Sequence, residues 1–100
     1  LEFWVDAGVT VLIVSGRTDA CKDATERWLL KHKIPYQHRD NLFMRKSGDT
    51  RNDAIIKKEI YDAEIKGKYN VLVVYDDRLR VVDMWRGVGL NVFQVNESPD

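Results

Sequence analysis

The sequence predicts the α/β class: a Rossmann-like parallel sheet with flanking helices. Two short apolar runs rich in β-branched residues, VTVLIVS (residues 9–15) and VLVVY (residues 71–75), are typical of strands buried on both faces of a parallel sheet. Segments with helical apolar spacing alternate with these runs, as in βαβ units. The chain has 100 residues and 44% hydrophobic content, which fits one compact domain over residues 1–100.

Strands and helices are predicted to alternate along the whole chain. The strands are predicted at residues 9–15, 42–45, 71–75 and 91–95. The helices are predicted from Asp19, a suitable N-cap, to about His32, from residue 53 to Gly67, and from residue 78 to Gly89. Polar connectors are expected at residues 33–41, which contain Pro35, and at residues 46–52.

The apolar positions of the helices predict the core. The side chains expected to be buried are Ala20, Cys21, Ala24, Trp28 and Leu29, then Ile56, Ile60 and Ala63, then Val81, Val82, Trp85 and Val88. Residues 1–8 (LEFWVDAG) have the spacing of a helix end followed by a capping glycine. We therefore expect further residues upstream of Leu1.

Composition excludes several classes of protein. Sixteen basic residues balance sixteen acidic ones, so no overall charge draws the chain to nucleic acid or to an anionic membrane. The longest apolar run is too short to span a bilayer, and the sequence has no secretion signal. The single cysteine, Cys21, suits a reducing compartment, and His32 and His38 lack partners at zinc-ligand spacing. These features predict a cytoplasmic protein that does not contact membranes.

Polar side chains are expected to meet at one edge of the predicted sheet. Ser15 and Arg17 leave the first strand there, and Asp76 and Asp77 leave the third. In right-handed βαβ units this edge also holds the helix N-termini, and ligands bind outside it. Lys57 lies near the start of the middle helix, and its side chain leans towards the same edge.

Each of these residues has two interpretations. Two adjacent carboxylates beside a phosphate site suit Mg²⁺, but Asp76 could instead cap the next helix while Asp77 pairs with Arg78 or Arg80. Ser15 and Gly16 offer a hydroxyl and backbone N–H groups as an anion cradle, or form an ordinary turn.

The lysine and the arginines are equally open to two interpretations. Lys57 could neutralise a phosphate oxygen, or it could be a solvated helix lysine. A locally basic region contains Arg17, Arg39, Arg45, Lys46 and Arg51. Its arginines could grip a charged substrate through bidentate contacts, or pair at the surface with Asp40, Asp49 and Asp53.

Three motifs carry a family resemblance. VLIVSGR (residues 11–17), MRKSGDTRNDAIIK (residues 44–57) and VYDDRLRVVDMWRGVGLNVFQV (residues 74–95) resemble the phosphatase domain of bacteriophage polynucleotide kinase-phosphatase, within the haloacid dehalogenase superfamily. The resemblance implies that Ser15, with Gly16, binds phosphate, and that Arg17 and Arg45 contact substrate. It implies that Lys57 is a catalytic, phosphate-binding lysine, and that Asp76 and Asp77 position Mg²⁺, with Asp77 essential for catalysis.

One departure from the superfamily pattern bears on function. The superfamily uses an Asp-x-Asp motif, whose first Asp is the nucleophile and whose second is the general acid and base. No such motif precedes Ser15, and the strand that should lie between those of Ser15 and Asp76 is also missing. We therefore expect an incomplete domain that lacks its nucleophile segment and is inactive alone, with exposed sheet edges that favour self-association.

The leading hypothesis is a parent protein that is a Mg²⁺-dependent phosphatase for phosphate monoesters, in particular the 3′-phosphates of nucleic acid ends. The alternative is a non-catalytic module that binds phosphate or nucleotide. A response-regulator receiver also uses strand-end acids and a lysine, but there the acids precede the lysine, whereas here Asp76 follows Lys57.

Overall fold

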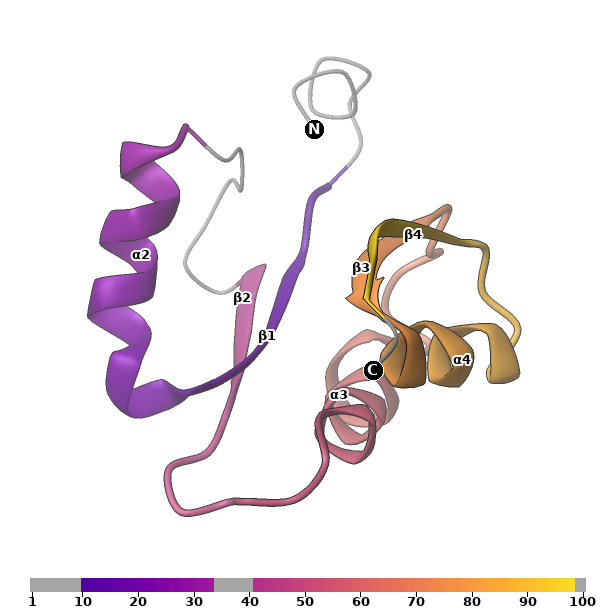
Figure 1. Cartoon of the computed structure of the whole chain (residues 1–100), viewed down its shortest axis with the longest axis horizontal. Coiled ribbons are helices and arrows are strands. Elements are labelled where there is room, and N and C mark those ends of the chain that lie inside the picture. The colour runs from indigo at the N-terminus through magenta and orange to yellow at the C-terminus, as the bar shows by residue number, and fades with distance from the viewer. Residues whose placement is uncertain (1–9, 34–40, 99–100) are drawn as a thin grey trace. The chain divides into compact units, whose positions relative to one another are not determined.

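The structure, a computed structural model, describes residues 10–33 and 41–98. The chain divides into two compact units, residues 1–50 and 51–100. Figure 1 shows both of them. Each unit contains two parallel strands with a helix between them in the sequence, the βαβ arrangement that the alternating pattern predicted.

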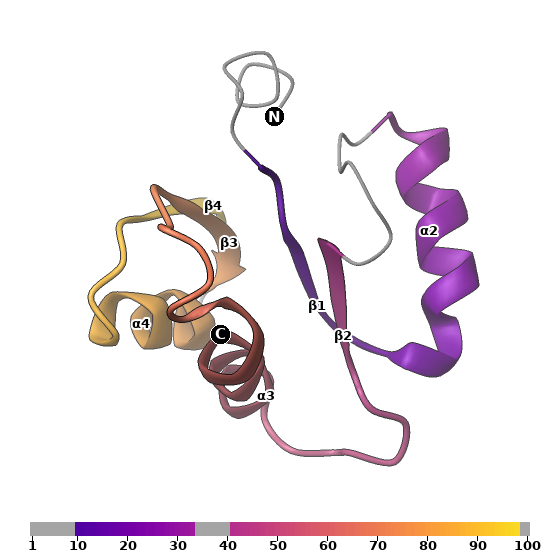
Figure 2. The ribbon, with the colours of Figure 1, turned by 180° about the vertical axis from the view of Figure 1, so that it is seen from behind.

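The first unit contains β1 (Ile13–Thr18), a short 3₁₀ turn η1 (Asp19–Cys21), α2 (Lys22–Lys31) and β2 (Leu42–Arg45). The strands β1 and β2 are parallel, with α2 alongside them, as Figure 2 also shows from behind. Buried apolar side chains come from the chain before β1, from α2 and from β2: Val11, Leu29 and Leu42.

The second unit contains α3 (Asp53–Ile60), a π-helical turn η3 (Tyr61–Ile65), β3 (Val74–Arg78), α4 (Leu79–Gly87) and β4 (Val92–Ser98). The strands β3 and β4 are parallel; α4 packs against both of them, and α3 packs against α4. The core of this unit consists of Ile56, Ile65, Val81, Val82 and Trp85.

The predicted fold class is confirmed, but two predicted strands are out of place. The strand β1 begins at Ile13 rather than residue 9, and β3 begins at Val74 rather than residue 71. Both strands also run past the predicted ends, because their polar residues still pair with a neighbouring strand. Asp76 therefore lies inside its strand, not behind it, and Ser15 lies in the middle of β1 rather than at its end.

The helix α2 ends where it was predicted to end, with His32 as its C-cap. The prediction that Asp19 caps it is wrong, because Asp19 lies inside η1 and its carboxylate accepts hydrogen bonds from Ser47 Oγ at 2.7 Å and Ser47 N at 3.0 Å. The side-chain hydrogen bond from Ser47 is the main reason that the pKa of Asp19 lies below its ordinary value.

The buried face of α2 is narrower than predicted. Leu29 is buried as expected, together with Thr25, whereas Ala20 and Ala24 are exposed and Trp28 is 51% exposed. The prediction that Trp28 is a core residue is wrong in this unit. The physical reason is that a two-stranded sheet covers only a narrow stripe of a helix.

The π-helical turn η3 changes which residues of the second helix are buried. Ile56 is buried as predicted and Ile60 is half-buried, but Ala63 is exposed and Ile65 is buried in its place. A π-helical turn contains more residues than an α-helical one, so it moves the apolar face along the sequence. The helical region still ends at Gly67, whose φ of 80° is the left-handed conformation expected after a helix.

The third predicted helix agrees with α4. Val81 and Val82 are fully buried, Trp85 is 3% exposed, and Val88 is half-buried. Gly89 follows with a φ of 93°. None of the helices in the described residues is long and apolar enough to cross a bilayer. The predictions for residues 1–9 and 34–40, which include Arg39, lie outside the described residues.

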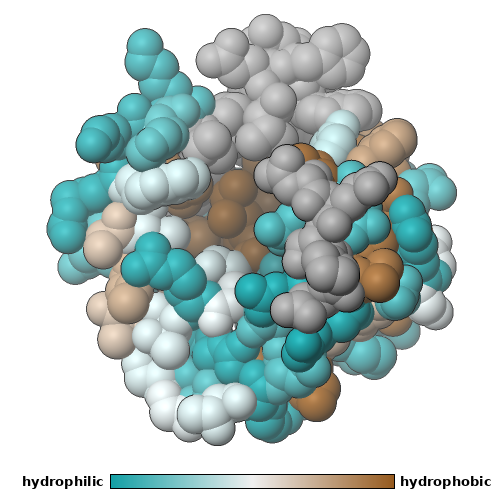
Figure 3. Space-filling model, in the orientation of Figure 1, coloured by the Kyte–Doolittle hydropathy of each residue, from teal (hydrophilic) through white to brown (hydrophobic). Residues whose placement is uncertain are grey.

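The outer face of the β3–β4 pair bears exposed apolar side chains. Tyr75 is 46% exposed, Phe93 61% and Val95 45%. Figure 3 shows brown, apolar atoms among those at the surface. Parallel strands are usually covered on both faces. Self-association through such a surface stays a prediction.

The π-helical turn leads to a test of the core of the second unit. Replacing Ile65 (4% exposed) by alanine removes buried apolar surface, so we expect the free energy of unfolding to fall by about 2–5 kcal/mol. The matched change Ile55→Ala, at a residue that is 47% exposed, should alter it by less than about 0.5 kcal/mol. Urea unfolding measures both variants, and equal losses would contradict the observed register.

Candidate functional site

The predicted site residues fall into two groups, one in each unit. Ser15, Gly16, Arg17 and Arg45 belong to the first unit, and Lys57, Asp76 and Asp77 to the second. The structure brings members of each group together. The meeting of the two groups around one phosphate stays a prediction.

A buried ion pair forms the centre of the second group. Lys57 Nζ lies 3.0 Å from Asp76 Oδ2, and the two side chains are only 13% and 8% exposed. Trp85 Nε1 donates to the same oxygen at 3.2 Å. The pair therefore joins α3 to β3, and the indole from α4 holds the carboxylate from a third direction.

The second oxygen of Asp76 is also occupied. Its Oδ1 accepts from the backbone N–H groups of Asp77 at 2.9 Å and Arg78 at 3.4 Å. Burial is the largest influence on the pKa of Asp76 and raises it. The charge and hydrogen bond of Lys57, the indole N–H and the backbone of Arg78 together outweigh burial and hold this pKa below the ordinary value of 3.8.

The two adjacent acids occupy different surroundings. The backbone of Asp77 is fixed, because its N–H donates to Asp76 and its carbonyl accepts from Gln94 Nε2 at 3.2 Å. Its carboxylate is exposed and has no hydrogen bond or ion pair with any residue that the structure describes. Both carboxylate oxygens of Asp76 thus accept hydrogen bonds from the protein, whereas the carboxylate of Asp77 is available to a ligand.

Asp76 and Asp77 are the candidate ligands of a metal ion in the second unit. Among residues 10–33 and 41–98, no group of three or more His, Cys, Asp or Glu side chains is arranged to hold one. Mg²⁺ needs fewer, since it is usually bound by one or two carboxylates together with waters and substrate phosphate. The exposed carboxylate of Asp77 fits this mode, with Asp76 beside it.

The alternative interpretation, in which Asp76 caps the next helix and Asp77 pairs with an arginine, agrees with the structure only in part. Asp76 does accept from backbone N–H groups just before α4, but the N-cap residue of α4 is Arg78. Arg78 does not pair with Asp77. Its Nη1 instead lies 2.6 Å from Asp53 Oδ2, which ties the end of β3 to the start of α3.

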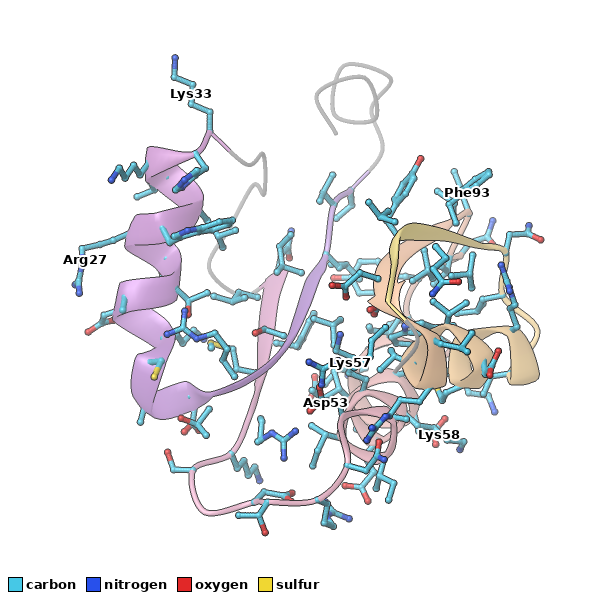
Figure 4. The ribbon with its side chains drawn as sticks, viewed as in Figure 1. Arg27, Lys33, Asp53, Lys57, Lys58 and Phe93 are labelled. Atoms are coloured by element: carbon cyan, nitrogen blue, oxygen red, sulfur yellow. The ribbon has the colours of Figure 1, made fainter. Side chains whose placement is uncertain are left out.

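Asp53 therefore belongs to the surroundings of the site, because it binds Arg78 next to the two acids. The sequence had suggested it only as a surface partner for arginines. It precedes Lys57 by four residues, so the two share one face of α3. Figure 4 labels Asp53 and Lys57, and shows Lys58 on another side of α3. Lys58 instead pairs with Asp62 at 2.8 Å. The Asp53–Lys57 spacing is the signal that could have identified Asp53.

Arg45 forms the centre of the first group. It is 8% exposed, so it is not a surface arginine. Its Nε donates to the carbonyl of Gly16 at 2.7 Å, and its Nη1 donates to the carbonyl of Asp49 at 2.9 Å. The guanidinium therefore fastens β1 to the turn after β2 and fixes the backbone of the Ser15–Arg17 segment.

The Ser15–Arg17 segment is an irregularity in the strand ladder. Ser15 pairs with Met44 and Thr18 pairs with Arg45, so Gly16 and Arg17 have no partners in β2. Ser15 Oγ accepts from the backbone N–H of Arg17 at 3.1 Å, and the Arg17 side chain is exposed. Such bulges are frequent beside active sites, because they redirect side chains.

A matching irregularity occurs in the second unit. Asp76 pairs with Gln94 and Arg78 pairs with Ser98, so Asp77 also lies where the register shifts. Arg17 and Asp77, the exposed charges of the two groups, thus lie at corresponding breaks in their strand pairs.

The buried ion pair leads to a test of stability. Lys57→Met leaves the Asp76 carboxylate buried without its ammonium, so we expect the free energy of unfolding at pH 7 to fall by about 3 kcal/mol. Lys58→Met, at an exposed helix pair, should change it by less than about 0.5 kcal/mol.

The pH dependence of these variants supplies an independent check. In the unchanged chain the pKa of Asp76 is depressed, so its contribution to stability is present above pH 3.8 and is lost as the pH falls through the folded-state pKa. Without Lys57, burial should raise this pKa, and protonation would relieve the buried charge. The stability gap should therefore narrow from pH 7 towards pH 3.8. A gap that widens on acidification would contradict this role of the pair.

Comparison with known proteins agrees with these motifs. The model of the family described as the polynucleotide kinase PNKP phosphatase domain matches residues 1–99. A relative from Autographa californica nuclear polyhedrosis virus, named "Putative bifunctional polynucleotide kinase/RNA ligase", is 38% identical over 86 residues. That match covers 85% of this chain and 12% of the viral protein.

Two solved structures resemble the chain in sequence and fold. A chain of the Pnkp1/Rnl/Hen1 complex is 45% identical with a TM-score of 0.88, and the match covers 95% of this chain and 32% of that one. A chain of the Pnkp1/Rnl/Hen1 RNA repair complex is 46% identical with a TM-score of 0.88, covering 95% and 30%. The chain thus spans at most about a third of the length of these relatives. It belongs to the family of PNKP polynucleotide kinase phosphatase domains.

Proposed function

We propose that this chain supplies the lysine, the paired acids and the phosphate-binding strand of a Mg²⁺-dependent phosphatase that removes 3′-phosphates from polynucleotide ends. The observation on which this depends is the buried Lys57–Asp76 pair, at 3.0 Å, beside the exposed carboxylate of Asp77. Membership of the PNKP phosphatase family supports phosphate monoesters of polynucleotides as the substrate class.

Lys57 is suited to bind a phosphate oxygen. Its ammonium has three N–H donors, and Asp76 accepts one of them. Asp76 fixes the position of Nζ, so little side-chain freedom is lost when phosphate binds. A lysine that is 13% exposed also interacts with an anion more strongly than a fully solvated one.

Asp77 is proposed as the principal protein ligand of Mg²⁺. Asp76, whose two oxygens already accept hydrogen bonds from the protein, would add a second negative charge beside the ion. When bound, Mg²⁺ would polarise the phosphate oxygens and neutralise part of their charge. The fixed backbone of Asp77 directs its carboxylate, while the Lys57 and Trp85 contacts keep Asp76 ionised beside it.

The first unit is proposed to bind phosphate through its Ser15–Arg17 segment. Ser15 and Gly16 would offer a hydroxyl and backbone N–H groups to the anion, and the exposed Arg17 would contact it with its planar guanidinium. Arg45 would hold the Ser15–Arg17 segment in position, because its guanidinium donates a hydrogen bond to the carbonyl of Gly16.

The nucleophile must come from elsewhere in the domain. The superfamily resemblance assigns that role to an Asp-x-Asp motif, and the 100 residues contain none. We therefore place catalytic turnover in a longer protein and expect these residues alone to bind phosphate without hydrolysing it. The same observation supports the second candidate, a module that binds phosphate or nucleotide without catalysis.

Adding the missing motif separates the two candidates. The chain is joined at Leu1 to a segment that carries an Asp-x-Asp motif and assayed for release of phosphate from a 3′-phosphorylated RNA oligonucleotide with Mg²⁺. We expect turnover that Asp77→Asn lowers about 100-fold or more, because metal stabilisation of the transition state is worth several kcal/mol. Asp83→Asn, at an exposed residue of α4, is the matched control and should retain activity. Turnover that survives Asp77→Asn would contradict the role of Asp77.

A binding measurement on the 100-residue chain does not depend on turnover. We expect millimolar Mg²⁺ with inorganic phosphate to raise the melting temperature of the unchanged chain, because both ligands bind only the folded state. The Asp77→Asn variant should lose the shift caused by Mg²⁺, and Asp83→Asn should retain it. An unchanged melting temperature with both ligands present would count against a phosphate and metal site of either kind.

A further inference from the structure

We propose that Trp28 and His32 on α2 form a stacking platform for a base of a single-stranded polynucleotide. This inference rests on the proposed function, because it adds a second contact for the strand whose 3′ end is processed. The sequence alone does not predict this platform, because the apolar spacing of α2 places Trp28 in the core and His32 has no partners at metal-ligand spacing.

The platform is held in place before any ligand binds. The rings of Trp28 and His32 are stacked, with centroids 4.3 Å apart and planes inclined by 25°. His32 Nδ1 donates to the backbone carbonyl of Trp28 at 2.9 Å, which fixes the imidazole against the last turn of the helix. A preformed aromatic surface loses little side-chain freedom on binding.

The platform is accessible. Thr25 and Leu29 face the core, whereas Trp28 lies beside this buried stripe and is 51% exposed. Ala24, one turn earlier on the same side of the helix, is small and exposed, and His32 is exposed as well. An exposed tryptophan of this kind has the surface on which nucleic acid bases stack.

The charge around the platform complements a phosphate backbone. Residues 27–33 (RWLLKHK) include Arg27, Lys31 and Lys33 and contain no acidic residue. All three cationic side chains belong to exposed residues. Figure 4 shows Arg27 and Lys33 extending away from β1 and β2. Basic side chains beside an aromatic platform are the combination used to bind single strands without sequence preference.

A second exposed aromatic pair lacks this complementarity. Tyr75 and Phe93 are stacked with ring centroids 5.7 Å apart, and Phe93 is 61% exposed. The strand that bears Tyr75 continues into Asp76 and Asp77, and the nearby Arg78 is paired with Asp53. Residues 91–97 (NVFQVNE) contain no basic residue to contact a phosphate backbone, so Phe93 provides a matched control.

The test measures binding of the full chain to a ten-nucleotide RNA with a 3′-hydroxyl end, which offers no phosphate to hydrolyse. We expect Trp28→Ala and Trp28→Leu to weaken binding about 5- to 150-fold, the range for losing one stacked base. Trp28→Phe should retain most of the affinity. Phe93→Leu should leave it unchanged. If Trp28 is a packing residue instead, for this chain or for another protein, leucine will replace it without loss, and the proposal fails.

Two further measurements keep the proposal testable if a variant does not fold. For the unchanged chain, an abasic oligonucleotide of equal length should bind more weakly than the RNA by the same factor, and equal affinities would overturn the stacking role. The double change Lys31→Ala, Lys33→Ala should reduce the slope of log affinity against log salt by about 1.4, since each phosphate contact contributes about 0.7. An unchanged slope would overturn the electrostatic part. Binding of 3′-hydroxyl RNA by the chain, with no turnover after the Asp-x-Asp segment has been added, would instead refute the proposed function alone.

Discussion

The ion pair between Lys57 and Asp76 is the contact on which the second unit depends. It joins α3 to β3 across a part of the molecule where both side chains are nearly buried, and Trp85 of α4 completes it. Removing one partner of such a pair costs more than the pair contributes, because the other charge remains buried. The same contact that orders these three elements also holds an ammonium group, with N–H donors to spare, beside the exposed carboxylate of Asp77.

Strand irregularities explain why the remaining functional groups are exposed. In a regular parallel ladder the backbone of Arg17 and Asp77 would be paired, and their side chains would follow the alternation of the strand. Both residues lie instead where the register shifts. The buried Arg45 and the half-buried Asp76, which lie next to them, donate and accept the hydrogen bonds that fix these breaks. Each unit thus combines one buried charge that positions the backbone with one exposed charge that can meet a ligand.

Much of this arrangement follows from the sequence. The order of elements, the strand at 42–45 and the buried face of α4 were predicted from apolar spacing, and Lys57 and the acids from their places at strand and helix ends. Residue spacing could not predict the π-helical turn that replaces Ala63 with Ile65 in the core. It also could not predict the burial of Arg45, which depends on carbonyl groups distant in sequence. Trp28 was misassigned because apolar periodicity identifies a helix face but not the width of the sheet beneath it.

The proposed function depends on phosphate binding by Lys57 beside a Mg²⁺ ion held by Asp77. The most direct measurement is an NMR titration of the chain with inorganic phosphate in the presence of Mg²⁺, following the side-chain Nζ of Lys57 and the backbone amide of Asp77. We predict that both signals shift with a single dissociation constant, while the Nζ signal of Lys58 does not move. Two different dissociation constants, or a Lys57 signal that stays in place while that of Lys58 moves, would contradict this role.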